Sequence, residues 1–436
     1  MYISDLFSFF VNDLENTISI DNEGIEIYDI FIRLIMYADD MVIFSESESG
    51  LQDALNNLHF YCNKWGISVN TKKTKIVVFK KGSSSTIQGQ WMYGDHILEV
   101  VPYFKYLGLS ISGNGSFTYH FRETVKSARR ALFGLRKSFN DNPEIYPKMK
   151  IDLFNSMVTP ILFYGCEVWG FCKADSLDRF YISFLKNVLG VKQSTPNCFV
   201  YGELGLYPLI IERKLRILKY WFKILKSEEN SFLRKVYNDL LLLSENSPDK
   251  VTWVTLFKKM LFENGFGFVW LNQNVENENC FLNMFEQRIK DSYYQEWNSQ
   301  VNLTSDYRLF KKIKQAFIFE KYLHMGNNVL RTAITKIRLS SHLFYIERGR
   351  WGKPKIEAIN RICDTCFVLE DEYHCLIECP KFVKERQNCL PNNLLKKPSM
   401  YEFLIFLSCL DKHMYHKVGL LCYRIMKAYK TQYLQE

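Results

Sequence analysis

Two adjacent aspartates, Asp39 and Asp40, lie between two short apolar runs, and this pattern restricts the local fold more than any other feature of the sequence. The runs cover residues 34–37 and 41–44, and both are too short for a helix. Two such runs on either side of a polar pair predict a tight β-hairpin that carries both carboxylates at its tip. Aspartate is also common in ordinary turns, so the pair alone does not define a functional site.

The aspartate pair has the chemistry of a metal site. Adjacent carboxylates repel each other, and a divalent cation relieves that repulsion. Mg²⁺ binds few carboxylates and keeps coordination positions for phosphate oxygens, which suits phosphoryl transfer by two metal ions. Asp39 and Asp40 are therefore candidate Mg²⁺ ligands.

Strand-like segments are concentrated in the first quarter of the chain, and helical periodicity dominates after it. Residues 47–66 are predicted to form a helix between the strand-like segments. Those segments after the hairpin are residues 67–70, 76–79 and 97–111. The predicted fold class is α+β, an antiparallel sheet with helices followed by helical regions. No run of about 18 apolar residues occurs, so we expect no transmembrane helix and no membrane partner.

The net charge of +9 is unevenly distributed along the chain. Residues 1–50 contain one basic and eleven acidic residues, so the remainder carries +19, and residues 51–150 alone carry +9. An acidic start followed by a basic body favours nucleic acid as a partner. Solvated faces of an ordinary protein are the alternative.

A basic amphipathic helix is predicted from Thr118 onward. Its apolar residues recur at helical spacing, and they are Phe121, Val125, Ala128, Leu132 and Leu135. Basic residues occupy much of the remaining surface, and they are Arg122, Lys126, Arg129, Arg130, Arg136 and Lys137. Such a face can follow a nucleic-acid backbone, and the alternative is a solvated amphipathic helix.

Four of the twelve cysteines lie within residues 363–379. Cys363, Cys366, His374 and Cys379 have a compact spacing that suits tetrahedral Zn²⁺. Cys375 adjoins His374 and competes with it as a ligand, and a chance cluster of buried cysteines is the alternative reading. The N-terminus does not resemble a signal peptide, so we expect the thiols to be reduced.

Several motifs, in order along the chain, resemble those of reverse transcriptases of the LINE-like (non-LTR retrotransposon) family. Tyr37-Ala38-Asp39-Asp40 with its apolar flanks resembles the catalytic hairpin of that family. Three later segments resemble the next palm motif, the far edge of the palm and the end of the thumb, and they are residues 65–75, 104–108 and 157–170. These proteins often end in a Cys-Cys-His-Cys zinc-binding segment, which the C-terminal cluster resembles.

The resemblance implies roles for individual residues. Asp39 and Asp40 would hold Mg²⁺, with Asp39 the more direct ligand, and Tyr37 would lie beside the primer end. Lys73 would lie near the phosphates of the incoming nucleotide, and a solvated lysine is the alternative for that residue. The resemblance further implies nucleic-acid contacts for Lys105, Tyr106 and Gly108.

The predicted organisation is a partial reverse transcriptase palm over residues 1–112 and a thumb-like helical region over 113–172. A helical linker over 173–335 and a zinc-binding region over 336–436 would follow. The site of the family also needs a third carboxylate and a fingers region upstream, for which the segment before Tyr37 is too short. We therefore expect the C-terminal part of a reverse transcriptase, N-terminally truncated, that does not polymerise DNA alone.

Three functions are compatible with these motifs. The chain is a reverse transcriptase fragment descended from an RNA-directed DNA polymerase of a non-LTR retrotransposon, a non-catalytic nucleic-acid-binding protein derived from a retrotransposon, or an unrelated zinc protein. The first two imply an RNA template and a DNA primer or target DNA as partners, with deoxynucleotides if the chain is active. They also imply an intracellular location, in the nucleus or the cytoplasm, within a ribonucleoprotein.

Overall fold

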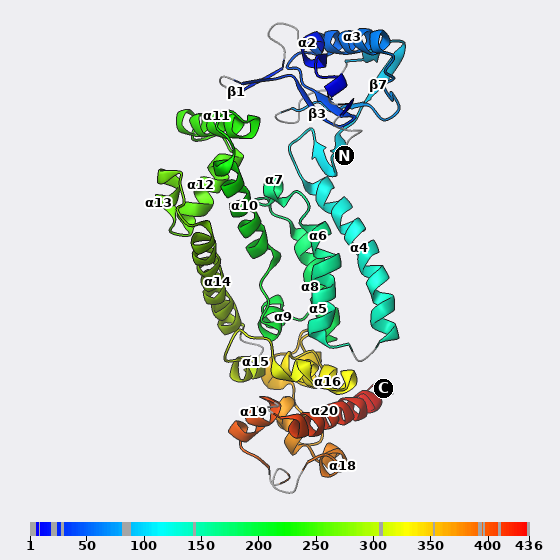
Figure 1. Cartoon of the computed structure of the whole chain (residues 1–436). Coiled ribbons are helices and arrows are strands. Elements are labelled where there is room, and N and C mark those ends of the chain that lie inside the picture. The colour runs from blue at the N-terminus through cyan, green and yellow to red at the C-terminus, as the bar shows by residue number, and fades with distance from the viewer. Residues whose placement is uncertain are drawn as a thin grey trace. The chain divides into compact units, whose positions relative to one another are not determined.

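The computed structural model describes residues 6–433, except residues 8, 19–23, 28–29, 81–88, 143–144, 305–307, 352–353, 391–394, 396 and 409–410. The chain forms two compact units (Figure 1). Unit 1 comprises Met1–Glu123, Tyr164–Lys173 and Arg213–Phe285, and unit 2 comprises Thr124–Phe163, Ala174–Glu212 and Glu286–Glu436. Each unit is therefore assembled from segments that are distant in the sequence.

The strands of the described residues form several small sheets in unit 1. They are β1 (Ile25–Ile27), β2 (Ile30–Ile32), β3 (Leu34–Tyr37), β4 (Asp40–Ile43), β5 (Lys75–Ile76), β6 (Trp91–Tyr93), β7 (His96–Val100), β8 (Tyr103–Tyr106) and β9 (Leu109–Ser112). The pairs β1–β2, β3–β4 and β8–β9 are antiparallel, and β7 pairs with β6 antiparallel and with β5 parallel. The predicted mixture of strands and helices is confirmed, but the strands form several small sheets instead of one antiparallel sheet, and β5 pairs with β7 in parallel.

The helix predicted over residues 47–66 is confirmed as α3 (Glu48–Trp65). Ser47 caps its first turn, because the side chain of Ser47 accepts a hydrogen bond from the N–H of Gly50 at 2.9 Å. Gly66 ends the helix with a φ of 67°, a left-handed conformation that glycine adopts readily.

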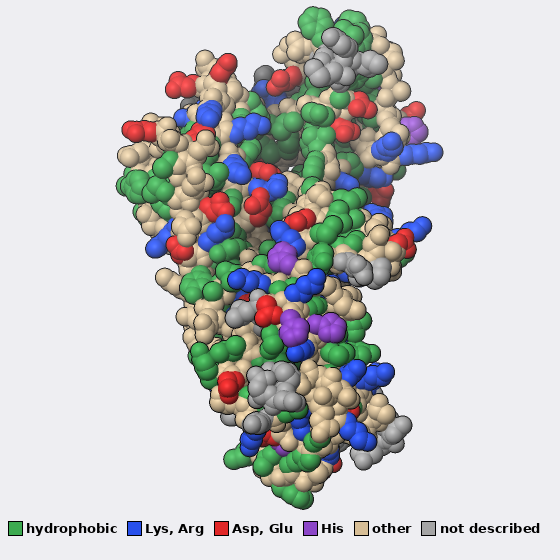
Figure 2. Space-filling model, turned by 60° about the horizontal axis from the view of Figure 1, so that its bottom comes forward, with side chains coloured by type: hydrophobic (Ala, Val, Ile, Leu, Met, Phe, Trp, Pro, Cys, Tyr) green, Lys and Arg blue, Asp and Glu red, His purple; other side chains and the backbone are tan. Residues whose placement is uncertain are grey.

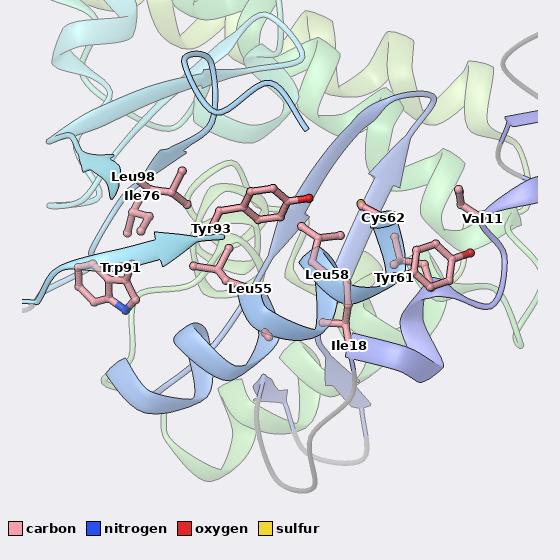
Figure 3. Packing of buried hydrophobic residues seen from close by; sticks show 12 residues of the cluster. Val11, Ile18, Leu55, Leu58, Tyr61, Cys62, Ile76, Trp91, Tyr93 and Leu98 are labelled. Carbon is pink, nitrogen blue, oxygen red and sulfur yellow. The ribbon is translucent and has the colours of Figure 1, made fainter. Parts of the chain in front are cut away.

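The core of unit 1 forms around the buried face of α3 (Figure 3). Leu55 and Leu58 of the helix lie beside Trp91, Tyr93 and Leu98 of the β6–β7 hairpin. Burial of these side chains removes apolar surface from water, which is the main favourable contribution to folding of such a unit.

The strand prediction for residues 67–70 is wrong. Ile67 and Val69 are partly buried against the core while Ser68 and Asn70 are exposed, so the alternation of sides is present. A strand also needs a hydrogen-bonded neighbour, and the structure gives this segment none among the described residues. The strand predicted over 76–79 is shortened for the same reason, since β5 ends at Ile76.

Helices form the remainder of unit 1. Those contained in it are α2 (Leu14–Ile18), α7 (Cys166–Trp169), α11 (Phe232–Asn246), α12 (Trp253–Glu263) and α13 (Gly267–Asn272). Three further helices run from one unit into the other, and they are α4 (Thr118–Asp141), α10 (Leu209–Lys226) and α14 (Glu278–Leu303).

The regular secondary structure of unit 2 is helical in its described residues, apart from an isolated β-bridge between Ile362 and Leu369. Its longer helices are α5 (Pro147–Met157), α8 (Asp175–Leu189), α9 (Asn197–Leu204), α16 (Asn328–Arg338), α19 (Met400–Ser408) and α20 (Lys412–Tyr433). Its short helical turns are α6 (Thr159–Leu162), α15 (Arg308–Ile313), η1 (Lys321–His324), α17 (Tyr345–Arg348), η2 (Ala358–Asn360), η3 (His374–Glu378), η4 (Pro380–Phe382) and α18 (Val383–Gln387).

A buried ion pair joins distant segments of unit 2. Arg338 of α16 donates to Glu203 of α9 through Nε at 2.6 Å and through Nη2 at 3.2 Å. The hydroxyl of Tyr322 donates to the same carboxylate at 2.7 Å. All three side chains are buried, and Oε2 of Glu320 also lies 3.2 Å from Nη2 of Arg338, so this cluster of charges fixes how these segments pack.

Three features of the described residues concern membrane-spanning helices, disulfides and surface charge. No helix in the described part is long and apolar enough to cross a membrane. None of the cysteines that the structure describes forms a disulfide. On the face shown in Figure 2, Lys and Arg side chains are interspersed with Asp and Glu side chains. The division of charge along the sequence therefore does not produce a face of one sign in this view.

Candidate functional site

The predicted hairpin is confirmed, with Tyr37 of β3 opposite Asp40 of β4 and Met36 opposite Met41. Met36 and Met41 are partly buried against the core of unit 1. Successive residues of a strand point to opposite faces, so Tyr37 and Asp40 point away from that core. Tyr37 is accordingly 66% exposed.

The tip of the hairpin is a two-residue turn of Ala38 and Asp39. Ala38 has a φ of 52°, in the left-handed region, which costs a non-glycine residue about 1–2 kcal/mol. The packing of the two strands must offset this cost. Asp39 and Asp40 are both exposed, so their carboxylates are accessible to a cation.

The β8–β9 hairpin places Tyr106 near Asp40. The hairpin turns through Leu107 and Gly108, whose φ values of 44° and 86° are those of a tight primed turn. The hydroxyl of Tyr106 is buried and has no hydrogen-bond partner among the described residues. Burial and then the negative charge of Asp40 raise the pKa of this hydroxyl.

Tyr164 holds the β8–β9 turn from a distant segment of unit 1. Its hydroxyl donates to the carbonyl of Leu107 at 2.5 Å. A Cβ on Gly108 would lie 2.7 Å from the Tyr164 ring, so the close approach requires glycine at that position. The predicted nucleic-acid contacts Tyr106 and Gly108 therefore lie on a turn with a fixed backbone, and Lys105 beside them is exposed.

Lys73 lies in the turn that precedes β5, and its side chain is exposed. Its N–H donates to the carbonyl of Asn70 at 3.0 Å, which closes the turn. The side chain is thus accessible to a phosphate, but its local contacts equally fit a solvated lysine.

The described residues bring no third ligand to Asp39 and Asp40. Wherever three or more Asp, Glu, His or Cys side chains approach closely enough to share a metal ion in the described part of the chain, the group includes Cys363. The hairpin alone therefore offers two carboxylates, which is an incomplete donor set for two Mg²⁺ ions.

The basic helix predicted from Thr118 onward is confirmed as α4, with the predicted division of faces. Each of the five apolar residues of its stripe is buried. The six predicted basic residues are exposed, and they are Arg122, Lys126, Arg129, Arg130, Arg136 and Lys137. Arg122 stacks over the ring of Tyr119 at 4.9 Å. The helix thus presents a cationic face from a well-packed apolar base.

The four predicted zinc ligands come together in unit 2. The metal-binding atoms of Cys363, Cys366, His374 and Cys379 all lie within 4.8 Å of one another. The sulfurs of Cys363 and Cys366 are each 3.9 Å from that of Cys379. Cys375, the competing candidate, is buried but is not a member of this group.

A tight turn sets the spacing of the first two cysteines. The N–H of Phe367 donates to the carbonyl of Cys363 at 2.9 Å, and the N–H of Cys363 donates to the carbonyl of Val368 at 2.8 Å. Phe367 has a φ of 55°, which reverses the chain directly after Cys366. Both thiols therefore face the same point, as in zinc sites built on a Cys-x₂-Cys turn.

His374 has one nitrogen available to a metal. Its Nδ1 lies 3.4 Å from Oε2 of Glu378, while its Nε2 is buried and has no partner among the described residues. A carboxylate on one ring nitrogen that leaves the other for a metal is the usual arrangement of a ligating histidine. Burial raises the pKa of the Cys379 thiol to about 12, a cost that a bound cation would remove. The residues present thus fit Zn²⁺.

The sequence pattern did not single out Tyr164 or Glu378 as parts of a site, and it did not single out Arg179 of α8, an exposed arginine. Tyr164 lies in a segment whose resemblance to the thumb was noted, yet its bond to Leu107 spans fifty-seven residues and leaves no local pattern. Glu378 follows His374 by four residues, a spacing that could have suggested the pair. Arg179 of α8 has no sequence signal that sets it apart.

A family model and several known proteins match parts of this chain, and the family match includes the β3–β4 hairpin. Residues 5–111 match the family model described as reverse transcriptase (RNA-dependent DNA polymerase). The chain is 26% identical over 155 residues, 34% of its length, to the probable RNA-directed DNA polymerase from transposon BS of Drosophila melanogaster. It is 22% identical over 240 residues, 53% of its length, to the RNA-directed DNA polymerase from mobile element jockey of the same species. A transposon-derived protein of Caenorhabditis elegans is 26% identical over 140 residues, 32% of this chain.

The matches cover part of each relative. They span 17% of the transposon BS protein, 25% of the jockey protein and 50% of the Caenorhabditis elegans protein. Residues 5–111 are therefore similar to a reverse transcriptase domain, and the relatives named above are transposon proteins.

Proposed function

We propose that the chain is a protein of LINE-like retrotransposon origin that binds nucleic acid and carries two carboxylates of a reverse transcriptase metal site. The observation that carries the proposal is the β3–β4 hairpin, which presents Tyr37, Asp39 and Asp40 inside the region that matches the family. Tyr106, from the second hairpin, is close enough to Asp40 for the negative charge of Asp40 to raise the pKa of its hydroxyl. In this proposal Tyr37 adjoins the primer end, and Lys73 approaches the phosphates of a deoxynucleotide.

By this proposal the polypeptide does not extend a primer by itself. Bound Mg²⁺ would neutralise phosphate oxygens during transfer, but two ions need more carboxylates than one Asp-Asp pair supplies. The described residues bring no third ligand to Asp39 and Asp40. The side chains of this chain would then orient a template–primer duplex without completing the reaction.

A second candidate function is non-catalytic binding of nucleic acid. The exposed cationic face of α4 favours it, because contacts to a phosphate backbone need no metal site. The partners would be an RNA template and a DNA primer or target DNA, within a ribonucleoprotein of the nucleus or cytoplasm. The Zn²⁺ site of Cys363, Cys366, His374 and Cys379 would stabilise the C-terminal part that holds the nucleic acid.

Primer extension tests the proposal that the chain does not extend a primer by itself. The purified chain, with Mg²⁺, all four deoxynucleotides and an RNA template annealed to a DNA primer, should give no more product than its Asp39→Asn variant. Asp95→Asn is the matched control, because Asp95 is an exposed aspartate of another hairpin turn in unit 1. Template-dependent extension that Asp39→Asn abolishes and Asp95→Asn retains would show an active enzyme and overturn the claim of inactivity.

A further inference from the structure

A groove of about 690 Å³ lies between α4 and α8, within unit 2. One wall is a stripe of α4 that contains Arg129, Phe133 and Arg136. These residues are spaced i, i+4 and i+7, so they follow one another on the same side of the helix. Arg179 and Phe180 of α8 line the opposite wall. The groove thus has a volume typical of a ligand site.

The charge of the groove is of one sign. Arg129, Arg136 and Arg179 line it, and no acidic side chain does. In the described part of the chain none of these guanidinium groups forms an ion pair with a carboxylate. Three arginines around one cavity repel each other, and an anion that bridges them would relieve this repulsion. The lining therefore suits a ligand that is negatively charged at more than one point.

The aromatic residues of the groove narrow the choice of anion. Phe133 is 75% exposed, so its ring is accessible to a ligand and could gain free energy by burial against one. It lies between Arg129 and Arg136 along the helix. Phe180 packs against Phe154, with ring centroids 6.1 Å apart. Exposed rings between cations can stack on bases whose phosphates meet the cations.

We propose that this groove binds a single strand of nucleic acid, with its phosphates on Arg129, Arg136 and Arg179 and a base on Phe133. The inference rests on the proposed function, since it gives the bound strand a place. A paired duplex keeps its bases stacked on one another, so it cannot offer a base to Phe133 without unstacking. An acidic peptide meets the arginines but gains nothing from the exposed ring.

The test measures binding of the full chain to a labelled single-stranded oligodeoxynucleotide of about ten nucleotides and to a duplex of the same sequence. Phe133→Ala and, separately, Arg179→Gln should weaken single-strand binding by about tenfold or more. Both should leave duplex binding within about twofold, because contacts of the outer face of α4 are unchanged. Phe60→Ala is the matched control, because Phe60 of α3 is 68% exposed and lies far from the groove in sequence.

The remaining outcomes separate a failure of the groove proposal from a failure of the proposed function. The groove proposal would be overturned if Phe133→Ala left single-strand affinity unchanged. It would also be overturned if Phe133→Ala weakened duplex binding as much as single-strand binding. Competition by polyglutamate as effective as that by unlabelled oligonucleotide would assign the groove to acidic peptides and also overturn it. A wild-type chain that binds neither single strand nor duplex would instead contradict the proposed function itself.

Discussion

Gly108 and Tyr164 show how single residues set the geometry beside the aspartates. Gly108 needs a positive φ and lies against the Tyr164 ring, whose hydroxyl holds the carbonyl of Leu107. The same turn carries Tyr106 towards Asp40. The sequence pattern predicted the β3–β4 hairpin, because that hairpin is encoded within a few positions, while Tyr106 and Gly108 were named only from the family resemblance. It could not predict Tyr164, because that contact depends on tertiary packing.

Gly108→Ala should destabilise unit 1 more than Gly115→Ala does. Gly115 has a φ of 72° and nothing within 4 Å of an added Cβ, so its substitution reports the backbone cost alone. At Gly108 the added Cβ also displaces the Tyr164 ring, which should add about 1 kcal/mol for the lost hydrogen bond.

Urea unfolding of both variants measures this difference. The comparison is repeated in a Tyr164→Ala background, where the added cost at Gly108 should disappear. Equal destabilisation by the two glycine substitutions in the wild-type background would show that Tyr164 does not hold the turn.

At the scale of elements, local periodicity predicted the helices well. The buried and exposed faces of α4 follow from spacing within its own residues, as does the end of α3 at Gly66. Strands depend on partners elsewhere in the chain, which is why residues 67–70 were assigned wrongly. The Cys/His segment combines both cases, since its spacing is local while the approach of Cys379 to Cys363 depends on how η3 folds.

Metal analysis of cysteine variants tests that segment. The purified chain should contain one Zn²⁺, and Cys366→Ser should lose it, because three ligands hold the ion far less tightly than four. Cys375→Ser should retain Zn²⁺, because Cys375 is outside the group of four. Loss of Zn²⁺ from Cys375→Ser with retention in Cys366→Ser would reverse the assignment, and a wild-type chain without Zn²⁺ would refute the site.

For the whole molecule, the segments that build each unit are separated in the sequence. Unit 1 takes residues 164–173 and 213–285 in addition to the first 123 residues, and nothing in the composition marks those boundaries. The Glu203–Arg338 pair likewise joins residues far apart in unit 2. The helices α3 and α4 and the β3–β4 hairpin could therefore be predicted from the sequence, but the grouping of elements into units could not. The basic face of α4 is exposed, and the proposed binding of nucleic acid depends on this face.

The dependence of binding on salt tests the central claim, that this chain holds nucleic acid through α4. The logarithm of its affinity for an RNA–DNA hybrid should fall linearly with that of the salt concentration. Arg130→Gln with Lys137→Gln should reduce the slope by about 1–2. Lys148→Gln is the control, because Lys148 of α5 is already paired with Asp152 at 2.8 Å and should leave the slope unchanged. Binding that is insensitive to salt, or a slope that the double variant does not alter, would contradict the account.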